Sequence, residues 1–144
     1  MPIREDQPVS EEPETTEAGT GDVVEIRLPA NSAYLSVLRT ATAGLAARLD
    51  FTLDEIDDLR IAVDEACALI LPDTVPGSEL ACRYTLNGAT LHVAVSAKTR
   101  SGQTPGRSSF AWTVLSALGG DVEVNTDQDD RVTIALRKHR SARP

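Results

Sequence analysis

The sequence predicts an α+β two-layer sandwich, in which three helices pack on one face of a mixed, mostly antiparallel sheet. Short runs of alternating apolar and polar residues are typical of strands, and three other segments carry apolar residues at helical spacing. The expected order, β-α-α-β-β-α-β-β, puts helices between runs of consecutive strands, which favours this fold class. With 144 residues, 41% of them hydrophobic, the chain can form one core in one domain.

The first expected elements are a strand and a helix joined at a proline. Residues 24–28 alternate apolar and charged side chains, and the strand is predicted to end at Pro29. Asn31 is expected to cap a helix that runs to Leu49, because its side chain can accept a hydrogen bond from a free backbone N–H. The apolar stripe of this helix is predicted to consist of Tyr34, Val37, Leu38, Ala41, Leu45 and Leu49.

A second helix is expected to follow directly. Thr52 and Glu55 form the sequence pattern of a capping box, in which each side chain satisfies a free backbone N–H of the first turn. The helix is predicted to end at Leu71, since Pro72 comes next. At 100° per residue, the side expected to face the sheet consists of Ile56, Leu59, Val63, Ala66, Cys67 and Ile70.

The same helix has a second row of residues on another side. Ile61, Glu65 and Leu69 are spaced four residues apart, so an acid lies between two apolar side chains. The row predicts a second covered face, over which a loop, a ligand or a partner lies. Scattered exposed apolar residues are the simpler interpretation, because such residues are common on protein surfaces.

A β-hairpin is expected next. Residues 80–86 and 91–95 both alternate, and Asn87-Gly88 between them predicts a type I′ turn, which needs two residues with positive φ. After a polar loop, a third helix is predicted from Ser109 to Leu118. Two final strands, VEVN and RVTIAL, are expected to flank a turn at residues 127–130.

The composition divides the chain into three parts. Residues 1–21 are expected to form a disordered acidic segment, residues 22–138 the folded domain, and residues 139–144 a basic tail that frays. The net charge of −8 argues against a nucleic-acid-binding protein, which needs Lys and Arg to neutralise phosphates. No apolar run resembles a secretory signal or a membrane helix, so we expect a cytoplasmic protein.

Neither the cysteines nor the histidines suggest a metal or catalytic centre. Cys67 and Cys82 occupy positions where an apolar residue is expected, and we interpret both as small buried side chains. His92 lies in a predicted strand and His139 in the tail, with no spacing typical of metal ligands or of a Ser-His-Asp arrangement. No metal site is predicted.

Two blocks of sequence carry a family resemblance. The segments YLSVLRTATAGLAARLDF and DEIDDLRIAVDEACALIL resemble anti-sigma factors of the RsbW/SpoIIAB type, within the histidine-kinase-like ATPase (GHKL) superfamily. The resemblance covers residues 23–138 and implies a domain that binds an alternative sigma factor of a stress or developmental response. It also implies ATP and Mg²⁺ as the family's cofactors, a STAS-type anti-anti-sigma antagonist as second partner, and the option of a homodimer.

The resemblance assigns site residues, many of which depart from the family pattern. Glu65 matches the family's general base, whereas Leu69 stands where the Mg²⁺-binding asparagine is expected, and an aliphatic side chain cannot bind Mg²⁺. The remaining nucleotide positions also depart from the expected aspartate and glycines: Ala97, Thr99, Ser109 and Ala111. Weak or lost ATP binding is therefore predicted.

The expected partner surface lies on the first helix. The resemblance gives Arg39 a role in binding the sigma factor and the antagonist, together with Tyr34 and Leu35. Without the resemblance, Arg39 would be interpreted as a solvated helix charge. The sequence thus predicts an anti-sigma factor that acts without efficient ATP use. The alternatives are an ATP-dependent serine kinase that phosphorylates its antagonist, and a degenerate sensor or scaffold domain.

Overall fold

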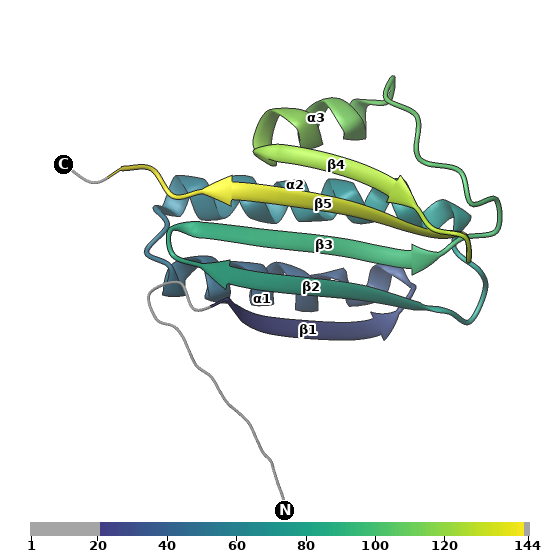
Figure 1. Ribbon diagram of the computed structural model, residues 1–144, viewed down its shortest axis with the longest axis horizontal. Helices are drawn as coiled ribbons and strands as arrows, with labels where there is room; N and C mark the ends of the chain where they lie inside the picture. The colour runs from purple at the N-terminus through teal and green to yellow at the C-terminus, as the bar shows by residue number, and fades with distance from the viewer. Residues whose placement is uncertain (1–20, 143–144) are drawn as a thin grey trace, which may run out of the picture.

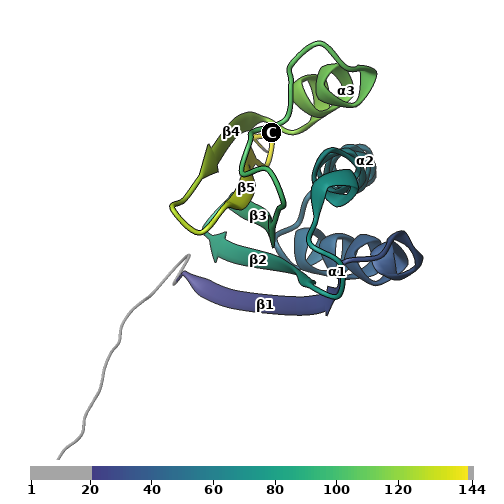
Figure 2. The ribbon, with the colours of Figure 1, turned by 90° about the vertical axis from the view of Figure 1, so that its right-hand side faces the viewer.

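Five strands form one open sheet in the order β1-β2-β3-β5-β4, and three α-helices cover one face of it (Figures 1 and 2). This computed structural model describes residues 21–142. The strands are β1 (Asp22–Pro29), β2 (Glu79–Asn87), β3 (Thr90–Lys98), β4 (Asp121–Thr126) and β5 (Arg131–His139). The helices are α1 (Leu35–Arg48), α2 (Leu53–Ile70) and α3 (Phe110–Leu118), with single 3₁₀ turns η2 (Ser32–Tyr34) and η3 (Leu71–Asp73).

The predicted fold class is confirmed. All four strand pairings are antiparallel, and an isolated bridge between Gly120 and Arg137 is parallel. In Figure 2 the helices lie on one side of the sheet, with α2 between α1 and α3. The helix order follows from packing, since α2 contacts both α1 and α3 and also lies against β3 and β5.

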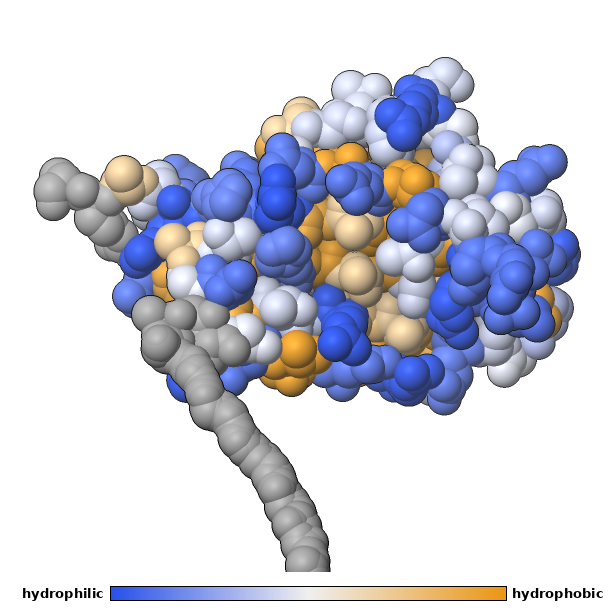
Figure 3. Space-filling view, in the orientation of Figure 1, coloured by the Kyte–Doolittle hydropathy of each residue, from blue (hydrophilic) through white to orange (hydrophobic). Residues whose placement is uncertain are grey.

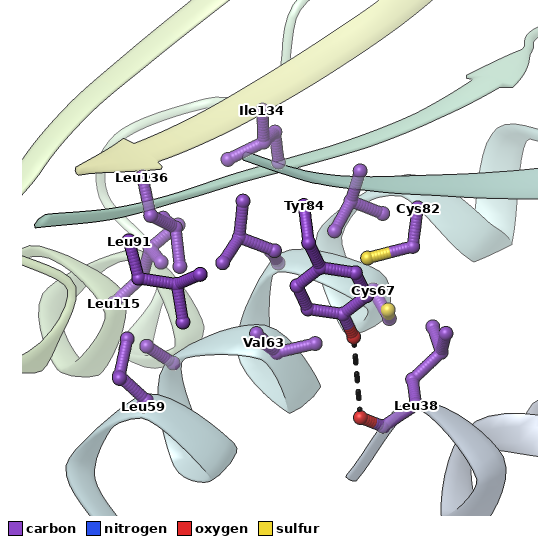
Figure 4. Close-up of a cluster of buried hydrophobic side chains, with 14 of the residues drawn as sticks. Leu38, Leu59, Val63, Cys67, Cys82, Tyr84, Leu91, Leu115, Ile134 and Leu136 are labelled. Carbon is purple, nitrogen blue, oxygen red and sulfur yellow. Dashed lines mark hydrogen bonds between the residues drawn. The ribbon is translucent and has the colours of Figure 1, made fainter. Parts of the chain in front are cut away.

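The second helix forms as its sequence predicts. Both bonds of the capping box are present: the Glu55 N–H donates to the Thr52 hydroxyl at 3.2 Å, and the Thr52 N–H donates to the Glu55 carboxylate at 2.7 Å. Every residue expected to face the sheet is buried, and Ala62 joins that set. The core that α2 forms with the sheet and with α3 includes Leu59, Val63, Leu91, Leu115, Ile134 and Leu136 (Figure 4).

The predicted stripe of α1 is right in part: Leu38 is buried and Ala41, Leu45 and Leu49 pack against the core, but Tyr34 and Val37 do not belong to the buried side. Tyr34 and Val37 are each 43% exposed, and the buried residues of the helix are Leu35, Leu38, Thr42 and Ala46. The prediction selected large apolar residues, whereas the buried side of α1 includes two small ones. Small side chains allow close approach of the helix to its neighbours, and the Thr42 hydroxyl forms a 2.8 Å hydrogen bond with the buried hydroxyl of Tyr84.

The hairpin forms, but its turn is shifted by one residue. Asn87 pairs with Thr90, which leaves Gly88 and Ala89 as the two central residues. Gly88 has φ of +65°, and neither Asn87 nor Ala89 has a positive φ. A turn with positive φ at its first central position alone is of the II′ kind, so the predicted type I′ turn at Asn87-Gly88 is corrected.

One face of the sheet has no helix over it. Figure 3 shows this face, with apolar and small residues in the middle and charged residues around them. Strand alternation places Ala94 and Ala135 there, paired with one another across β3 and β5. Arg83 and Glu123 lie in the same cross-strand row, on β2 and β4.

The end of the described chain is attached further than predicted. His139 belongs to β5, and the next two residues are bonded as well. The Arg140 N–H donates to the Ala89 carbonyl at 2.7 Å, and the Ser141 N–H donates to the Glu55 carboxylate at 2.8 Å. The expectation that the tail frays from His139 is therefore wrong as far as Ser141. The predicted acidic segment, residues 1–21, lies outside the described residues except for Gly21, whose N–H donates to the Leu86 carbonyl at 3.1 Å.

Within residues 21–142, no helix combines the length and the apolar character needed to cross a membrane.

Candidate nucleotide groove and partner surface

A groove of about 330 Å³ opens at the carboxyl end of α2. Its walls come from α2, from η3 and from the loop that follows β3, with one residue of β5. The lining residues are Leu69, Ile70, Asp73, Thr99, Ser101, Gln103, Thr104, Pro105 and Val132. Two predicted nucleotide positions, Leu69 and Thr99, thus lie in one site.

The α2 side of this groove offers no ligand for a hard cation at the expected position. Leu69 is half-buried and presents only carbon to the groove. Glu65, one turn earlier, is also half-buried, and the structure gives it no hydrogen bond or ion pair with any residue in 21–142. Across the same range no cluster of three or more His, Cys, Asp or Glu is arranged to hold a metal ion.

The second face predicted for α2 is covered only in part. Glu65 and Leu69 are half-buried, and Leu69 packs against the core. Ile61 is 42% exposed, so the expected cover does not extend over the whole row.

The β3 side of the groove has its polar groups already bonded. Ala97 is fully buried between its cross-strand neighbours Leu80 and Val132 and has no polar side chain to present. The hydroxyl of Thr99, a residue only 3% exposed, donates to the Asp130 carbonyl at 2.8 Å and accepts from the Gly102 N–H at 2.9 Å. Thr99 therefore anchors the loop after β3 to the β4–β5 turn.

The same loop is also tied to η3. The Arg100 N–H donates to the Asp73 carbonyl at 2.8 Å, and the Arg100 guanidinium donates to the Pro72 carbonyl at 3.0 Å. The Asp73 carboxylate lies 3.8 Å from Arg100 Nε and accepts from the Ser101 hydroxyl. These contacts use the only carboxylate that lines the groove.

The two predicted positions on α3 are separate from the groove lining. Ser109 caps α3, accepting from the Trp112 N–H at 3.1 Å, as the sequence predicts. Its hydroxyl thus satisfies an N–H group at the helix end, where the family's glycines would leave backbone N–H groups open to a phosphate. Ala111, in the first turn, is half-buried.

The two cysteines are structural. Cys67 on α2 and Cys82 on β2 are free, fully buried thiols within the core, as predicted (Figure 4). Burial raises the pKa of Cys82 to about 11 and raises that of Cys67 further still. Neither thiol is poised to form a thiolate near neutral pH.

On the opposite side of α2, Arg39 of α1 pairs with Asp64. Arg39 Nε lies 3.0 Å and 2.8 Å from the two carboxylate oxygens, and both side chains are partly exposed, 45% for Arg39 and 32% for Asp64. The pair joins α1 to α2 at the surface of the helical layer. Its position in the α1–α2 seam puts Arg39 on the solvent side of the domain, where a partner protein can reach it.

The other two predicted partner residues differ in exposure. Tyr34 lies in η2, directly before α1, and is 43% exposed, whereas Leu35 is buried in the core, only 9% exposed. A shallow apolar surface formed by Ser36, Val37, Thr40 and Ala41 lies on the outer side of α1.

Sequence reasoning missed two residues that shape these sites. Asp64 is 25 positions from Arg39, and Asp73 is 28 positions from Ser101. A pairing between distant segments leaves no periodic or local signal in a single sequence. The one available indication for Asp64 is its place on the polar side of α2, directly before Glu65.

Comparison with known proteins gives relatives of one kind. The chain is 32% identical to the serine-protein kinase RsbW of Bacillus pumilus over 84 residues, which are 55% of this chain and 52% of that protein. It is 31% identical to the anti-sigma-F factor RsbW of Mycobacterium tuberculosis over 104 residues, 72% of this chain and 62% of that protein. No protein-family model matches.

The fold has a counterpart among solved structures. The crystal structure of the RsbU and RsbW domains of Rv1364c from Mycobacterium tuberculosis matches with a TM-score of 0.65 and 16% identity. The match covers 87% of this chain and 34% of that one. The likeness shows that this chain shares its α+β fold with that structure.

By sequence, the chain is similar to the two RsbW proteins above. It spans about half to three-fifths of the length of these relatives, 52% and 62%.

Proposed function

We propose that this chain is an anti-sigma factor that acts by binding. It sequesters an alternative sigma factor of a stress or developmental response in the cytoplasm, and a STAS-type antagonist releases it, without efficient use of ATP. The observation that carries the proposal is the contrast between the two sides of α2. One side holds Arg39 in a defined position at the surface, and the other presents Leu69 where Mg²⁺ would need an oxygen ligand.

The binding half of the proposal rests on the α1–α2 surface. Arg39 is partly exposed there, so a partner can contact its guanidinium. Arginine is enriched at protein–protein interfaces and among the residues that dominate their affinity. The net charge of −8 also complements a basic, DNA-binding partner.

The residues of the groove do not fit ATP with Mg²⁺. Leu69 provides no oxygen, and the Thr99 hydroxyl is occupied on both its donor and its acceptor side. Asp73 is engaged by the loop opposite. Binding a triphosphate there requires breaking several of these contacts, so we expect affinity for ATP to be weak or absent.

The test is a binding measurement with purified components. Each alternative sigma factor encoded by the same genome is titrated against the chain by calorimetry, with and without millimolar Mg-ATP. We expect one sigma factor to bind, with a Kd that nucleotide leaves unchanged. Sedimentation of the complex then reports whether one or two copies of the chain take part.

Arg39→Glu should weaken that complex at least about tenfold, which is ~1.4 kcal/mol, because it replaces a charge-assisted contact with a repulsive one. The matched control is Arg137→Glu, which makes the same charge change in an exposed ion pair on the sheet, where Arg137 Nη2 lies 2.8 Å from Asp121. If no sigma factor binds, or if both variants behave alike, this role for the α1–α2 surface is wrong.

A second candidate function keeps the kinase activity, and Glu65 is the observation that favours it. This carboxylate is half-buried beside the groove and is bonded to no residue in 21–142, as a general base awaiting a substrate would be. Transfer of labelled phosphate from ATP to a serine of the antagonist, abolished by Glu65→Gln, would establish this function. Saturable micromolar ATP binding would likewise overturn the binding-only proposal.

A further inference from the structure

Asp64 contacts only one edge of the Arg39 guanidinium. Both of its carboxylate oxygens lie within 3.0 Å of Nε, so the single Nε–H is shared between them. No hydrogen bond with any residue between 21 and 142 engages either terminal nitrogen of Arg39. The end formed by the two terminal nitrogens is therefore free, and its pair of parallel N–H groups matches the two oxygens of a carboxylate.

The contact fixes a side chain that would otherwise be mobile. An arginine on a helix surface has many rotamers, and ordering them on binding weakens affinity. Here the ordering is already done in the free protein, because Asp64 projects from α2 and holds Nε across the α1–α2 seam. Exposed ion pairs contribute little to folding stability, so a stabilising role alone does not account for this geometry.

We propose that Asp64 is a positioning residue for partner binding: it holds Nε of Arg39 so that the two terminal amino groups face outward, toward a carboxylate of the sigma factor. This inference rests on the proposed function and adds a residue and a partner chemistry to it. Arg39 is then bonded by two carboxylates in the complex, one from α2 on the Nε edge and one from the partner on the outer edge.

The experiment is a double-mutant cycle on the sigma factor identified by the binding screen. Asp64→Ala should weaken the complex about three- to tenfold, mainly through faster dissociation, because the arginine must then be ordered on binding. In the Arg39→Ala background the same substitution should change Kd less than about twofold, since Asp64 acts through Arg39. Asp64→Asn, which keeps an acceptor for Nε, should retain part of the wild-type affinity.

Two controls separate positioning from other effects. Asp121→Ala removes a similar exposed partner from Arg137 on the sheet and should leave Kd unchanged. Arg39→Lys keeps the charge but loses the two parallel N–H groups, and should weaken the complex as much as Arg39→Ala does. Thermal unfolding of each variant, with a midpoint close to that of the wild type, verifies that the fold is intact.

The outcomes are distinct. If the wild type binds no sigma factor, the proposed function fails. If the wild type binds and Asp64→Ala binds equally well or more tightly, Asp64 does not position Arg39. If Asp64→Ala is equally damaging in the Arg39→Ala background, Asp64 acts on the partner or on the fold directly, and the inference is overturned as well.

Discussion

The hydroxyl of Tyr84 offers a quantitative test of how α1 is attached to the sheet. Tyr84 is fully buried, and its hydroxyl donates to the Leu38 carbonyl at 3.3 Å (Figure 4). Its only proton is used there, so the 2.8 Å contact with Thr42 has the threonine as donor. The two bonds join the middle strand of the β1–β2–β3 half of the sheet to the buried side of α1.

Tyr84→Phe removes both bonds and leaves the ring in place. The bond to Leu38 is long for an O–H···O contact, so most of the loss comes from the Thr42 bond. The Thr42 hydroxyl can turn to the carbonyl four residues earlier in α1, which limits the penalty for an unpaired group. We therefore expect a loss of about 1–1.5 kcal/mol in the free energy of unfolding.

Thr42→Val should cost about 1 kcal/mol, because the Tyr84 hydroxyl keeps its bond to Leu38. Since the two residues share one hydrogen bond, the double variant should lose less than the sum, with a coupling of about 0.5–1 kcal/mol. Urea titrations followed by the fluorescence of Trp112 give the three values. The control is Tyr34→Phe, an exposed tyrosine for which we expect a change within about 0.3 kcal/mol.

A Tyr84→Phe variant as stable as the wild type would refute this reasoning, and so would strict additivity of Tyr84→Phe and Thr42→Val. Either result would mean that the buried hydroxyls do not hold α1 to the sheet, and that apolar contact alone does so. A change in the denaturant slope would instead indicate an altered unfolded state.

Three further predictions concern single groups. The hydrogen bond from the Thr52 backbone N–H, above all, lowers the pKa of Glu55 to about 2. The ionised Glu55 therefore contributes stability above the unfolded pKa near 4.5, and this contribution is lost as the pH falls toward 2. In urea titrations from pH 7 to pH 2, Glu55→Gln should reduce the loss of stability at acid pH. Gly88→Ala should lower the free energy of unfolding by about 1 kcal/mol, because Gly88 has a φ of +65°. Asn87→Ala should lower it by less than about 0.5 kcal/mol, and equal losses at both positions would instead support a type I′ turn at Asn87-Gly88. Cys67 and Cys82 should not react with Ellman's reagent in native buffer and should both react in guanidinium, since burial raises the pKa of each thiol; rapid reaction of the native protein would show that the core opens.

The sequence predicts the elements of this fold where local chemistry determines them. The capping box at Thr52 and Glu55, the serine cap of α3 and the alternation of β2 and β3 each depend on neighbours within a few residues, and all three are confirmed. Local signals of this kind act in any tertiary context, which is why they can be read from one chain.

The wrong predictions concern contacts between distant segments. Which side of α1 is buried depends on the Tyr84 hydroxyl and on the approach of α2, neither of which is visible in the helix itself. The Asn87-Gly88 pair predicts one turn, but the pairing of β2 with β3 sets the register and moves the turn by one residue. The predicted end of the folded domain at residue 138 is wrong for the same reason, since the Ser141 N–H donates to Glu55, 86 positions earlier.

The sequence predicted which residues line the groove, but it did not predict the hydrogen bonds that surround them. The family resemblance located Leu69 and Thr99, and they line one groove. It gave no indication that Asp73 would hold the facing loop, or that Asp64 would hold Arg39, because these depend on three-dimensional proximity.

The position of β5 in the sheet has a consequence for how the protein is made. This strand leaves the ribosome after the other four, yet it lies between β3 and β4 and, among the strands of residues 21–142, is the only one that pairs with β4 (Figure 1). Until it emerges, β3 has an unpaired edge and β4 has no neighbour at all. A nascent chain stalled before Arg131 therefore exposes a strand edge with unpaired backbone N–H and C=O groups. Such an edge is prone to aggregation unless a chaperone covers it.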